Sequence, residues 1–506
     1  MPTNTIRSSA LALLLACCPP AANCAIKLPG ILSSHMVLQR DRPIHIWGWS
    51  DPGEKVTVVM RGSKRETTGD GFGNWSVFLP PDGAGGPYTL TVTGGNEIAL
   101  DDVLVGDVWF ASGQSNMEMP LKGFGGAPLK NGAEEIAHAN QPQLRLLHIP
   151  TKAADFPLRN ADASWTVCSP ETAANFSAVA YFFGRDLAAR EHVPIGLIDS
   201  TWGGTVAEAW VSLQAISSDG ALMPVFATRA QMMMSQADNM AILAKERRED
   251  QAARQAGRTP PNHPWRPDPA SWAPAALFNG MVAPVTPYTI KGVIWYQGES
   301  NSRLTFAPMY ARIFPALIND WRAQWHEGNF PFLFVQIANF KSSANEAWAA
   351  VREAQRRTLS VANTAMAVTI DIGDPANVHP ADKQTVGARL ALAARALAYG
   401  ENVVYSGPLF RQATPEGDAM RVWFDHAAEL MTKGDALQGF EIAGDDGHFV
   451  SAKARLDGNT VVLSDASVPT PKYVRYGWAN APIVNLYNGE GLPASPFTSE
   501  DGIPVP

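Results

Sequence analysis

The pattern of apolar and polar residues divides the chain into parts of different texture. Residues 26–102 contain short runs, at 43–49, 55–60 and 88–92, in which apolar and polar side chains alternate, with Gly, Pro and Asp between them. Alternation with a period of two is typical of half-buried strands, and turns of this kind separate the strands of small sandwiches. We therefore expect an N-terminal β-rich domain at residues 26–102.

From residue 103 to about 400, short apolar runs alternate with segments of helical periodicity. This alternation is typical of a parallel sheet that is covered by helices on both faces. The fold class predicted for residues 103–400 is therefore α/β, with a doubly wound parallel sheet. The expected strands are 103–110, 195–199, 291–296, 332–337 and 365–370, and the expected helices are 179–190, 309–325, 347–360 and 384–398.

Two further segments depart from this pattern. Residues 214–276 are first helical and Met-rich, then highly charged, and finally rich in Pro and Trp. An insertion of this length near the strand ends predicts either a lid or wall of a substrate site, or a mobile excursion, and the sequence leaves both open. Residues 401–506 return to a strand pattern, which predicts a C-terminal β-rich domain, either a second sandwich or an added sheet.

The first 25 residues have the features of an export signal. Arg7 is followed by an apolar stretch at 10–16 and by small residues that lead to Ala25. The apolar stretch is too short to span a membrane. We expect an exported protein, periplasmic or extracellular, that keeps Cys168 as its only cysteine and therefore has no internal disulfide. Residues 14–17 also resemble a lipobox, and the alternative is a lipid anchor at Cys17.

Composition narrows the classes of partner. The chain has 506 residues and a formal net charge of −8, which argues against nucleic acid or an anionic membrane as the main partner. Its length predicts two or three domains. The 15 Trp residues fit the stacking of sugar rings and core packing equally well. No oligomeric state is predicted.

A candidate nucleophile follows the first predicted strand of the α/β region. Ser115 lies in the stretch Gly113-Gln114-Ser115-Asn116. Ligands of parallel sheets bind at the carboxyl ends of the strands, and a sharp turn there exposes a serine hydroxyl beside free N–H groups. The stretch is not Gly-x-Ser-x-Gly, which disfavours an ordinary α/β-hydrolase elbow. A simple turn explains the same residue types, since all four are common in turns.

Serine needs a base to become nucleophilic. His379 follows the last predicted strand and is therefore expected at the same sheet edge as Ser115. Its loop, residues 371–380, contains acidic residues, which suits a general base that is held by an orienting partner. Asp374 is the nearest candidate for that partner.

Other strand ends offer groups that can hold an oxyanion. Gly203 and Gly204 follow the second predicted strand, and glycines allow backbone N–H groups to approach a reacting carbon closely. Gln297 follows the third strand and offers a side-chain amide. Glu299 and Asn301, in the same polar cluster, are expected to orient their neighbours.

Taken together, these stretches resemble the sialate O-acetylesterase family of the SGNH hydrolases. The resemblance extends to residues 35–40 and 491–497 and covers nearly the whole mature chain. It rests chiefly on Gly113-Gln114-Ser115-Asn116-Met117-Glu118, Trp202-Gly203-Gly204-Thr205, Trp295-Tyr296-Gln297-Gly298-Glu299-Ser300-Asn301, and Ile372-Gly373-Asp374 with His379-Pro380.

The resemblance implies a three-layer α/β/α domain with β-rich flanks, and an activity that removes O-acetyl groups from sugars without a metal or another cofactor. It implies Ser115 as nucleophile and His379 as base. The Ser115 N–H, a glycine of the Gly203-Gly204 pair (assigned to Gly204) and Gln297 would form the oxyanion hole.

Two positions depart from the SGNH pattern. Ala376 stands where these enzymes commonly carry Asp, three residues before the catalytic His. Either Asp374 substitutes for it, or the enzyme works with a Ser–His dyad and a backbone carbonyl near Asn377 holds the imidazole. Gln297 stands where the superfamily has Asn, as this family tends to have it.

We therefore expect a carbohydrate O-acetylesterase that works through an acetyl-enzyme. Its substrate would be acetylated plant hemicellulose, such as xyloglucan or xylan, or O-acetylated sialic acid, with a slight preference for the plant substrate. The alternatives are a non-catalytic carbohydrate-binding protein and a lipid or aryl esterase of the same superfamily.

Overall fold

The computed structural model describes residues 25–505 except 235, 262, 264–265 and 267. All of the predicted leader except Ala25, and the three cysteines in it, lie outside the described residues. Cys168 is buried, as expected of a core residue. Within the described ranges, no helix is long and apolar enough to cross a membrane.

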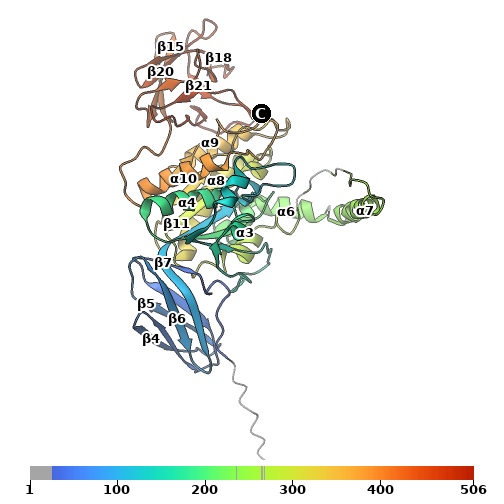
Figure 1. Ribbon diagram of the computed structural model, residues 1–506. Helices are drawn as coiled ribbons and strands as arrows, with labels where there is room; N and C mark the ends of the chain where they lie inside the picture. Colours follow the sequence, from blue (N-terminus) through green and yellow to red (C-terminus); the bar gives the residue numbers. More distant parts are fainter. Residues whose placement is uncertain (1–24, 235, 262, 264–265, 267, 506) are drawn as a thin grey trace, which may run out of the picture.

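A large, mostly parallel sheet lies at the centre of the molecule (Figure 1). Its strands run in the order β13-β12-β11-β7-β10-β8-β9, and all adjacent pairs are parallel except β8 and β9. This arrangement confirms the predicted α/β class. The strands are β7 (Glu97–Gly113), β8 (Gln141–His148), β9 (Thr166–Cys168), β10 (Ile195–Thr201), β11 (Gly292–Tyr296), β12 (Phe332–Val335) and β13 (Thr364–Ala367).

Helices cover both faces of this sheet. Trp109 packs edge-on against Phe183 of α4 (Ala178–Glu191), with ring centroids 5.0 Å apart. Its neighbour Phe110 packs against Trp321 of α8 (Ala307–Trp325) at 5.4 Å. Because successive side chains of a strand point to opposite faces, α4 and α8 lie on opposite sides of β7. α10 (Lys383–Leu397) packs on α4, and α9 (Trp348–Thr358) packs on α8.

The five predicted strands are all present, but β8 and β9 were not predicted. β8 begins with Gln141-Pro142-Gln143, and only residues 144–147 of the strand are buried. A strand that is half polar gives neither a continuous apolar run nor clean alternation, so the pattern hides it.

The N-terminal β region is joined to the central sheet by one continuous strand. β7 runs for 17 residues from the N-terminal sheet into the centre, so the predicted boundary at residue 102 lies inside it. Asp101 and Asp102 lie within the strand, and Asp102 has a φ of 56°. The other strands of this region are β1 (Val37–Gln39), β2 (Ile44–Trp49), β3 (Lys55–Met60), β4 (Ser63–Thr68), β5 (Asn74–Leu79) and β6 (Gly85–Thr93).

The C-terminal region is a second β structure with its own core. Its sheets, β14-β15-β20-β19 and β18-β17-β21-β23, share one apolar cluster that includes Val422, Leu463, Ile442 and Phe497. Two facing sheets around one core form a sandwich, the first of the two predicted alternatives. The strands are β14 (Leu409–Glu416), β15 (Ala419–Asp425), β16 (Met431–Thr432), β17 (Phe440–Ala443), β18 (Val450–Ser451), β19 (Lys453–Asp457), β20 (Thr460–Ser464), β21 (Tyr473–Tyr476), β22 (Leu486–Tyr487) and β23 (Phe497–Thr498).

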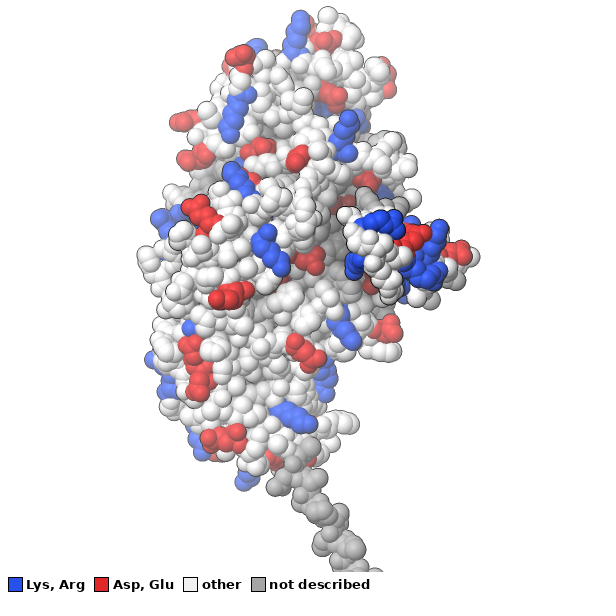
Figure 2. All heavy atoms as spheres, turned by 45° about the vertical axis from the view of Figure 1, so that its right-hand side comes forward, with Lys and Arg blue, Asp and Glu red and all other residues white. Residues whose placement is uncertain are grey.

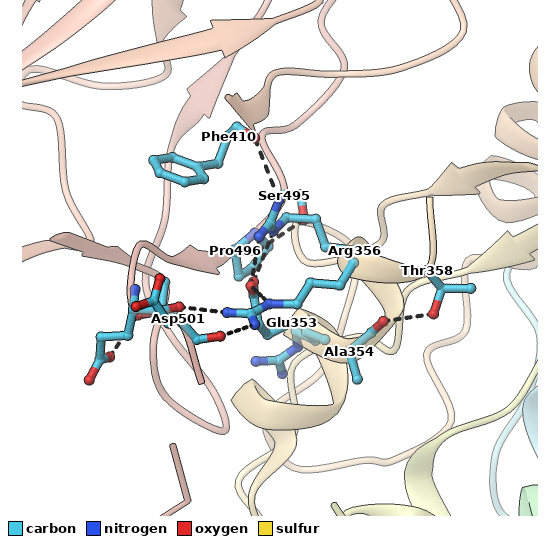
Figure 3. A network of polar contacts seen from close by, with 12 residues as sticks. Glu353, Ala354, Arg356, Thr358, Phe410, Ser495, Pro496 and Asp501 are labelled. Carbon is cyan, nitrogen blue, oxygen red and sulfur yellow. Dashed lines mark hydrogen bonds and ion pairs between the residues drawn. The ribbon is translucent and has the colours of Figure 1, made fainter. Parts of the chain in front are cut away.

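Polar contacts fasten this sandwich to α9 (Figure 3). The buried carboxylate of Glu353 accepts hydrogen bonds from Arg356 and Arg357, each at 2.6 Å. Arg357 also donates to the main-chain oxygens of Glu500 and Asp501, at 2.7 and 2.6 Å. Because both oxygens of the buried Glu353 carboxylate accept hydrogen bonds from arginines, the cost of desolvating its charge is offset. The bonds of Arg357 to Glu500 and Asp501 hold the C-terminal segment against the central domain.

The predicted insertion forms an arm. α5 (Leu213–Ser218) and α6 (Pro224–Met234) lead to α7 (Gln236–Gln255), which projects from the body of the molecule in Figure 1. In Figure 2 charged side chains of both signs crowd on the arm and are sparser on the rest of that face. The chain then returns to the central domain, where Trp272 is buried.

Candidate active site

Three strand ends meet at one edge of the central sheet. Gly113, the last residue of β7, lies opposite Thr201 of β10 on one side and Tyr296 of β11 on the other. The segments that follow these strands carry Ser115, the Gly203-Gly204 pair and Gln297. The ends of β7, β10 and β11 therefore lie side by side, as the sequence analysis predicts.

The turn before Ser115 requires glycine. Gly113 has a φ of +138°, and a Cβ there would collide with the main-chain oxygen of Tyr296. The chain then enters the short helix α1 (Ser115–Glu118). As the first residue of a helix, Ser115 has an N–H without an intrahelical acceptor, beside its own partly exposed hydroxyl.

His379 meets Ser115 directly. Its Nε2 lies 2.9 Å from the Ser115 Oγ, and its main-chain N–H donates to Asn377 Oδ1 at 3.0 Å. The edge of Phe124 packs against the imidazole, with centroids 5.2 Å apart. Burial, assisted by the charge of Lys383, lowers the pKa of His379 to about 4. The ring is therefore neutral at pH 7, and its Nε2 can accept the serine proton when Nδ1 carries the hydrogen.

The orienting partner expected for His379 is not in contact with it. Asp374 is exposed and accepts a hydrogen bond from the Ala376 N–H at 2.8 Å. Within the described part of the chain, Nδ1 of His379 has no hydrogen-bond partner, neither a carboxylate nor a carbonyl near Asn377. The structure thus brings together Ser115 and His379, and leaves Asp374 in the turn that precedes His379.

The glycine pair lies beside the nucleophile. A Cβ on Gly203 would lie 3.2 Å from the Ser115 Cβ and 2.5 Å from Glu118 Oε2. Gly204 has a φ of +71°, and its carbonyl oxygen accepts a hydrogen bond from Trp272 Nε1 at 2.7 Å. The end of the insertion therefore fixes the segment that carries the proposed oxyanion donor.

Gln297 is buried next to the site, and its amide already has partners. Its Nε2 donates to the Thr205 oxygen at 3.2 Å and to Asn301 Oδ1 at 2.6 Å, and its Oε1 accepts from Tyr310 at 3.0 Å. Asn301 in turn donates to Glu208 at 2.9 Å. These bonds tie Gln297 to the Gly204 segment and to Asn301. The supporting role of Asn301 and direct donation from Gln297 to an oxyanion both stay predictions.

Sequence comparison relates this chain to acetylesterases. The family model described as "Carbohydrate esterase, sialic acid-specific acetylesterase" matches residues 265–396. Rat sialate O-acetylesterase is 31% identical over 97% of both chains, and the human enzyme is 32% identical over 77% of this chain and 74% of its own. This chain belongs to the sialate O-acetylesterase family.

A solved structure agrees with this membership. A carbohydrate acetylesterase from Xanthomonas citri is 38% identical, covers 94% of this chain and 100% of its own, and has a TM-score of 0.81. Together, the family membership and this structure confirm the predicted enzyme class, an esterase, and the predicted fold.

In this member of the sialate O-acetylesterase family, a network of buried polar side chains lies behind Ser115 and His379. The sequence did not reveal this network. Lys383 donates to Asn116 Oδ1, and Asn116 donates to Glu299 Oε1 and to the Val378 oxygen. Asn116 and Glu299 stood in quoted stretches, but Lys383 opens an amphipathic helix, where lysine is normally exposed. Only the burial of Lys383 and its hydrogen bond to Asn116 of α1 show its position.

A second group near Gly203 was also missed. His148 Nδ1 lies 3.0 Å from Asp199 Oδ2, and that hydrogen bond raises the pKa of His148. Burial and the charge of Asp199 raise the pKa of Glu118. His148 ends β8, the strand that the pattern hides, so no signal pointed to it.

Proposed function

We propose that this esterase removes acetyl groups from the hydroxyls of a carbohydrate, with Ser115 as nucleophile and His379 as general base. The observation that carries the proposal is the 2.9 Å contact between Ser115 Oγ and His379 Nε2 at the carboxyl edge of the sheet. A nucleophile and a base within hydrogen-bond reach are the geometric requirement for acyl transfer.

In the first half of the reaction, Ser115 Oγ attacks the ester carbonyl while His379 Nε2 takes its proton. The negative charge that develops on the carbonyl oxygen would be held by the N–H groups of Ser115 and Gly204. Each donor of this kind stabilises the transition state by roughly 3–4 kcal/mol. Gln297 fits a supporting role, because its amide holds the Thr205 oxygen and so restrains the segment of Gly204.

The intermediate then breaks the bond to the sugar oxygen, which leaves as a hydroxyl with the proton from His379. Ser115 now carries the acetyl group. In the second half, His379 takes a proton from water, the resulting hydroxide attacks the acetyl carbonyl, and acetate leaves as Ser115 regains its proton. Atoms balance as ester plus water giving sugar plus acetic acid, which ionises to acetate and a proton.

For the substrate, we propose an acetylated neutral oligosaccharide from plant hemicellulose, xyloglucan or xylan, with O-acetylated sialic acid as the second candidate. Glu118 lies beside Gly203, and the charge of the buried Asp199 raises the pKa of Glu118. His148 contacts Asp199 and can offset one of the two negative charges. A sugar that carries its own carboxylate would bring a third acidic group to this pair, whereas a neutral sugar would not. The curated relatives bear the name of the sialate substrate, which favours the second candidate.

We also propose export, on the basis of the leader at residues 1–25. A secreted or periplasmic enzyme would meet polysaccharide fragments outside the cytoplasm, and this location agrees with the proposed plant substrate.

The test is acetate release by the wild-type enzyme without added metal. The substrates would be acetylated xyloglucan and xylan oligosaccharides, O-acetylated sialic acid, and aryl esters of acetate and of longer acids. We expect the highest kcat/KM on an acetylated sugar and a steep fall as the acyl chain lengthens. Equal rates on long acyl esters would support the lipid or aryl esterase instead. Sugar binding with no acetate release would support the non-catalytic alternative.

A further inference from the structure

Three buried polar side chains join the helix of the nucleophile to the loop of the base. Lys383, at the start of α10, donates from Nζ to Asn116 Oδ1 at 2.5 Å. Asn116, in α1, donates from Nδ2 to Glu299 Oε1 at 2.5 Å and to the Val378 oxygen at 3.0 Å. Lys383, Asn116 and Glu299 are 0%, 1% and 8% exposed, so water does not compete for these bonds.

Lys383 determines which way the Asn116 amide faces. An ammonium group only donates hydrogen bonds, so it must meet the oxygen of the amide and not its nitrogen. The NH2 group then faces Val378 and Glu299, which both offer oxygens. Since Asn116 follows Ser115 and Val378 precedes His379, a single amide fixes the two main-chain segments whose side chains react.

Charge balance explains why a lysine is tolerated at this depth. Lys383 faces Asn116, the carboxylates of Glu299 and Asp382, and the ring of Tyr296 at 5.4 Å. Burial lowers its pKa to about 7, and the two carboxylates oppose that change. Glu299 Oε2 has no hydrogen-bond partner among the described residues, so the network is neither an ordinary surface pair nor a fully satisfied structural one.

We propose that Lys383 is a positioning residue of the esterase reaction, which acts through the amide of Asn116 to hold His379 in place against Ser115. The inference rests on the proposed function, because it assigns Lys383 a part in the same Ser115–His379 reaction.

The charge of Lys383 adds a measurable signature. The groups that face His379 are Ser115 of α1, Phe124, Asn377 of its own loop, and Lys383 of α10. Lys383 is the one charged group among these, and its charge helps to lower the pKa of His379. Removing the charge should raise that pKa. Because His379 works as a base only when it is neutral, the acid limb of the kcat/KM profile should move to higher pH.

The main test compares Lys383→Met with the wild-type enzyme in kcat, KM and the pH profile. We expect kcat to fall about 100-fold or more, because a small displacement of reacting groups costs that much. KM should change less than about threefold, since Lys383 is fully buried, and the acid limb should shift upward. The matched control is Lys130→Met, which removes an exposed lysine that pairs with Asp382 at 3.0 Å beside the same helix start.

Two further variants separate geometry from charge. Lys383→Gln keeps an N–H donor without the charge, and we expect it to recover part of kcat while the acid limb stays shifted. Asn116→Asp keeps the acceptor for Lys383 but cannot donate to Val378, and we expect a loss of kcat as large as that of Lys383→Met. A Lys383→Met enzyme with the kcat and pH profile of wild type would overturn the proposal.

A readout that does not need turnover distinguishes this inference from the proposed function. The His379 pKa would be followed by NMR of ¹³C-labelled histidine in the Ser115→Ala background, with and without Lys383→Met. An upward shift supports the proposal, and an unchanged pKa contradicts it, whatever the activity of Ser115→Ala. Should Lys383→Met not fold, Lys383→Gln and Asn116→Asp carry the same tests.

Discussion

His379 Nε2 lies 2.9 Å from Ser115 Oγ, although 264 positions separate the two residues in the chain. Parallel strands produce this contact. β7 and β13 both end at the same edge of the sheet, with β11 and β12 between them. The loop after β13 reaches α1, where Asn116 donates to the Val378 oxygen. The pair is held at the Ser115 end by the Gly113 turn and at the His379 end by Asn377 and Phe124.

The first prediction concerns Asp374. Its carboxylate is exposed and caps the Asp374–Asn377 turn, without contact to His379. Replacing it with Ala should lower kcat by less than about fivefold, whereas loss of the acid from a true triad costs about 10⁴-fold. Steady-state kinetics of Asp374→Ala decides between these values. A fall of several thousandfold would mean that Asp374 reaches His379 during the reaction.

The second prediction is a low acid limb. His379 has a pKa of about 4, against an ordinary value of 6.5, because it is buried and lies near Lys383. The neutral, active base therefore predominates above about pH 4, and kcat/KM should stay nearly flat between pH 5 and 6, below the pKa of about 7 of Lys383 (about a tenth of a unit or less of log rate). Because the fold lowers the pKa of His379, the contribution of this residue to the free energy of unfolding should fall as pH decreases from about 6.5 to about 4. An acid limb of the kcat/KM profile near pH 6.5 would contradict the lowered pKa of His379.

The third prediction concerns Gly203. An added Cβ would lie 2.5 Å from Glu118 Oε2 and 3.2 Å from Ser115 Cβ. The end of Glu118 can turn away, but Ser115 cannot without leaving His379. Gly203→Ala should therefore lower kcat by about 10- to 100-fold while the free energy of unfolding changes by about 1 kcal/mol.

Gly83→Ala is the control for that variant, because nothing lies within 4 Å of an added Cβ there. It should keep the wild-type kcat. A Gly203→Ala enzyme that also keeps it would show that the Gly203 segment tolerates displacement.

The fourth prediction concerns stability. Arg352 of α9 is fully buried and donates to the main-chain oxygens of Ile337, Ala338, Ala479 and Asn480, at 3.0, 3.0, 2.8 and 2.6 Å. Arg352→Met would leave these oxygens unpaired, and the free energy of unfolding should fall by about 3–5 kcal/mol. Denaturant unfolding measures it. The exposed Arg411→Met, whose nearest carboxylate is 3.9 Å away, should change it by less than about 1 kcal/mol.

The parts of the site that lie along the chain just after apolar strands could be predicted from the sequence. Ser115, Gly203, Gln297 and His379 all follow such strands, and parallel strands bring their ends to one edge. The same logic gave the α/β class and both β-rich flanks. The end of the N-terminal region at residue 102 could not be predicted as well, because β7 continues through that position without a break.

What escaped prediction depends on packing between distant elements. Lys383 looks like an exposed helix residue, and only the folded structure shows that it is buried beside Asn116 and Tyr296. His148 was hidden because β8 begins with exposed polar residues. The partners of Gln297 and the separation of Asp374 from His379 are matters of a few ångströms, which spacing along a chain does not determine.

The central claim is that Ser115 is the nucleophile, and acetate release by Ser115→Ala tests it most directly. On the best acetylated sugar, wild type and variant would be compared at equal concentration of folded protein. The account predicts that the variant loses at least about 10⁴-fold in kcat, since neither water nor His379 alone replaces the attacking oxygen. Release within tenfold of wild type (about 1.4 kcal/mol in activation free energy) would contradict it.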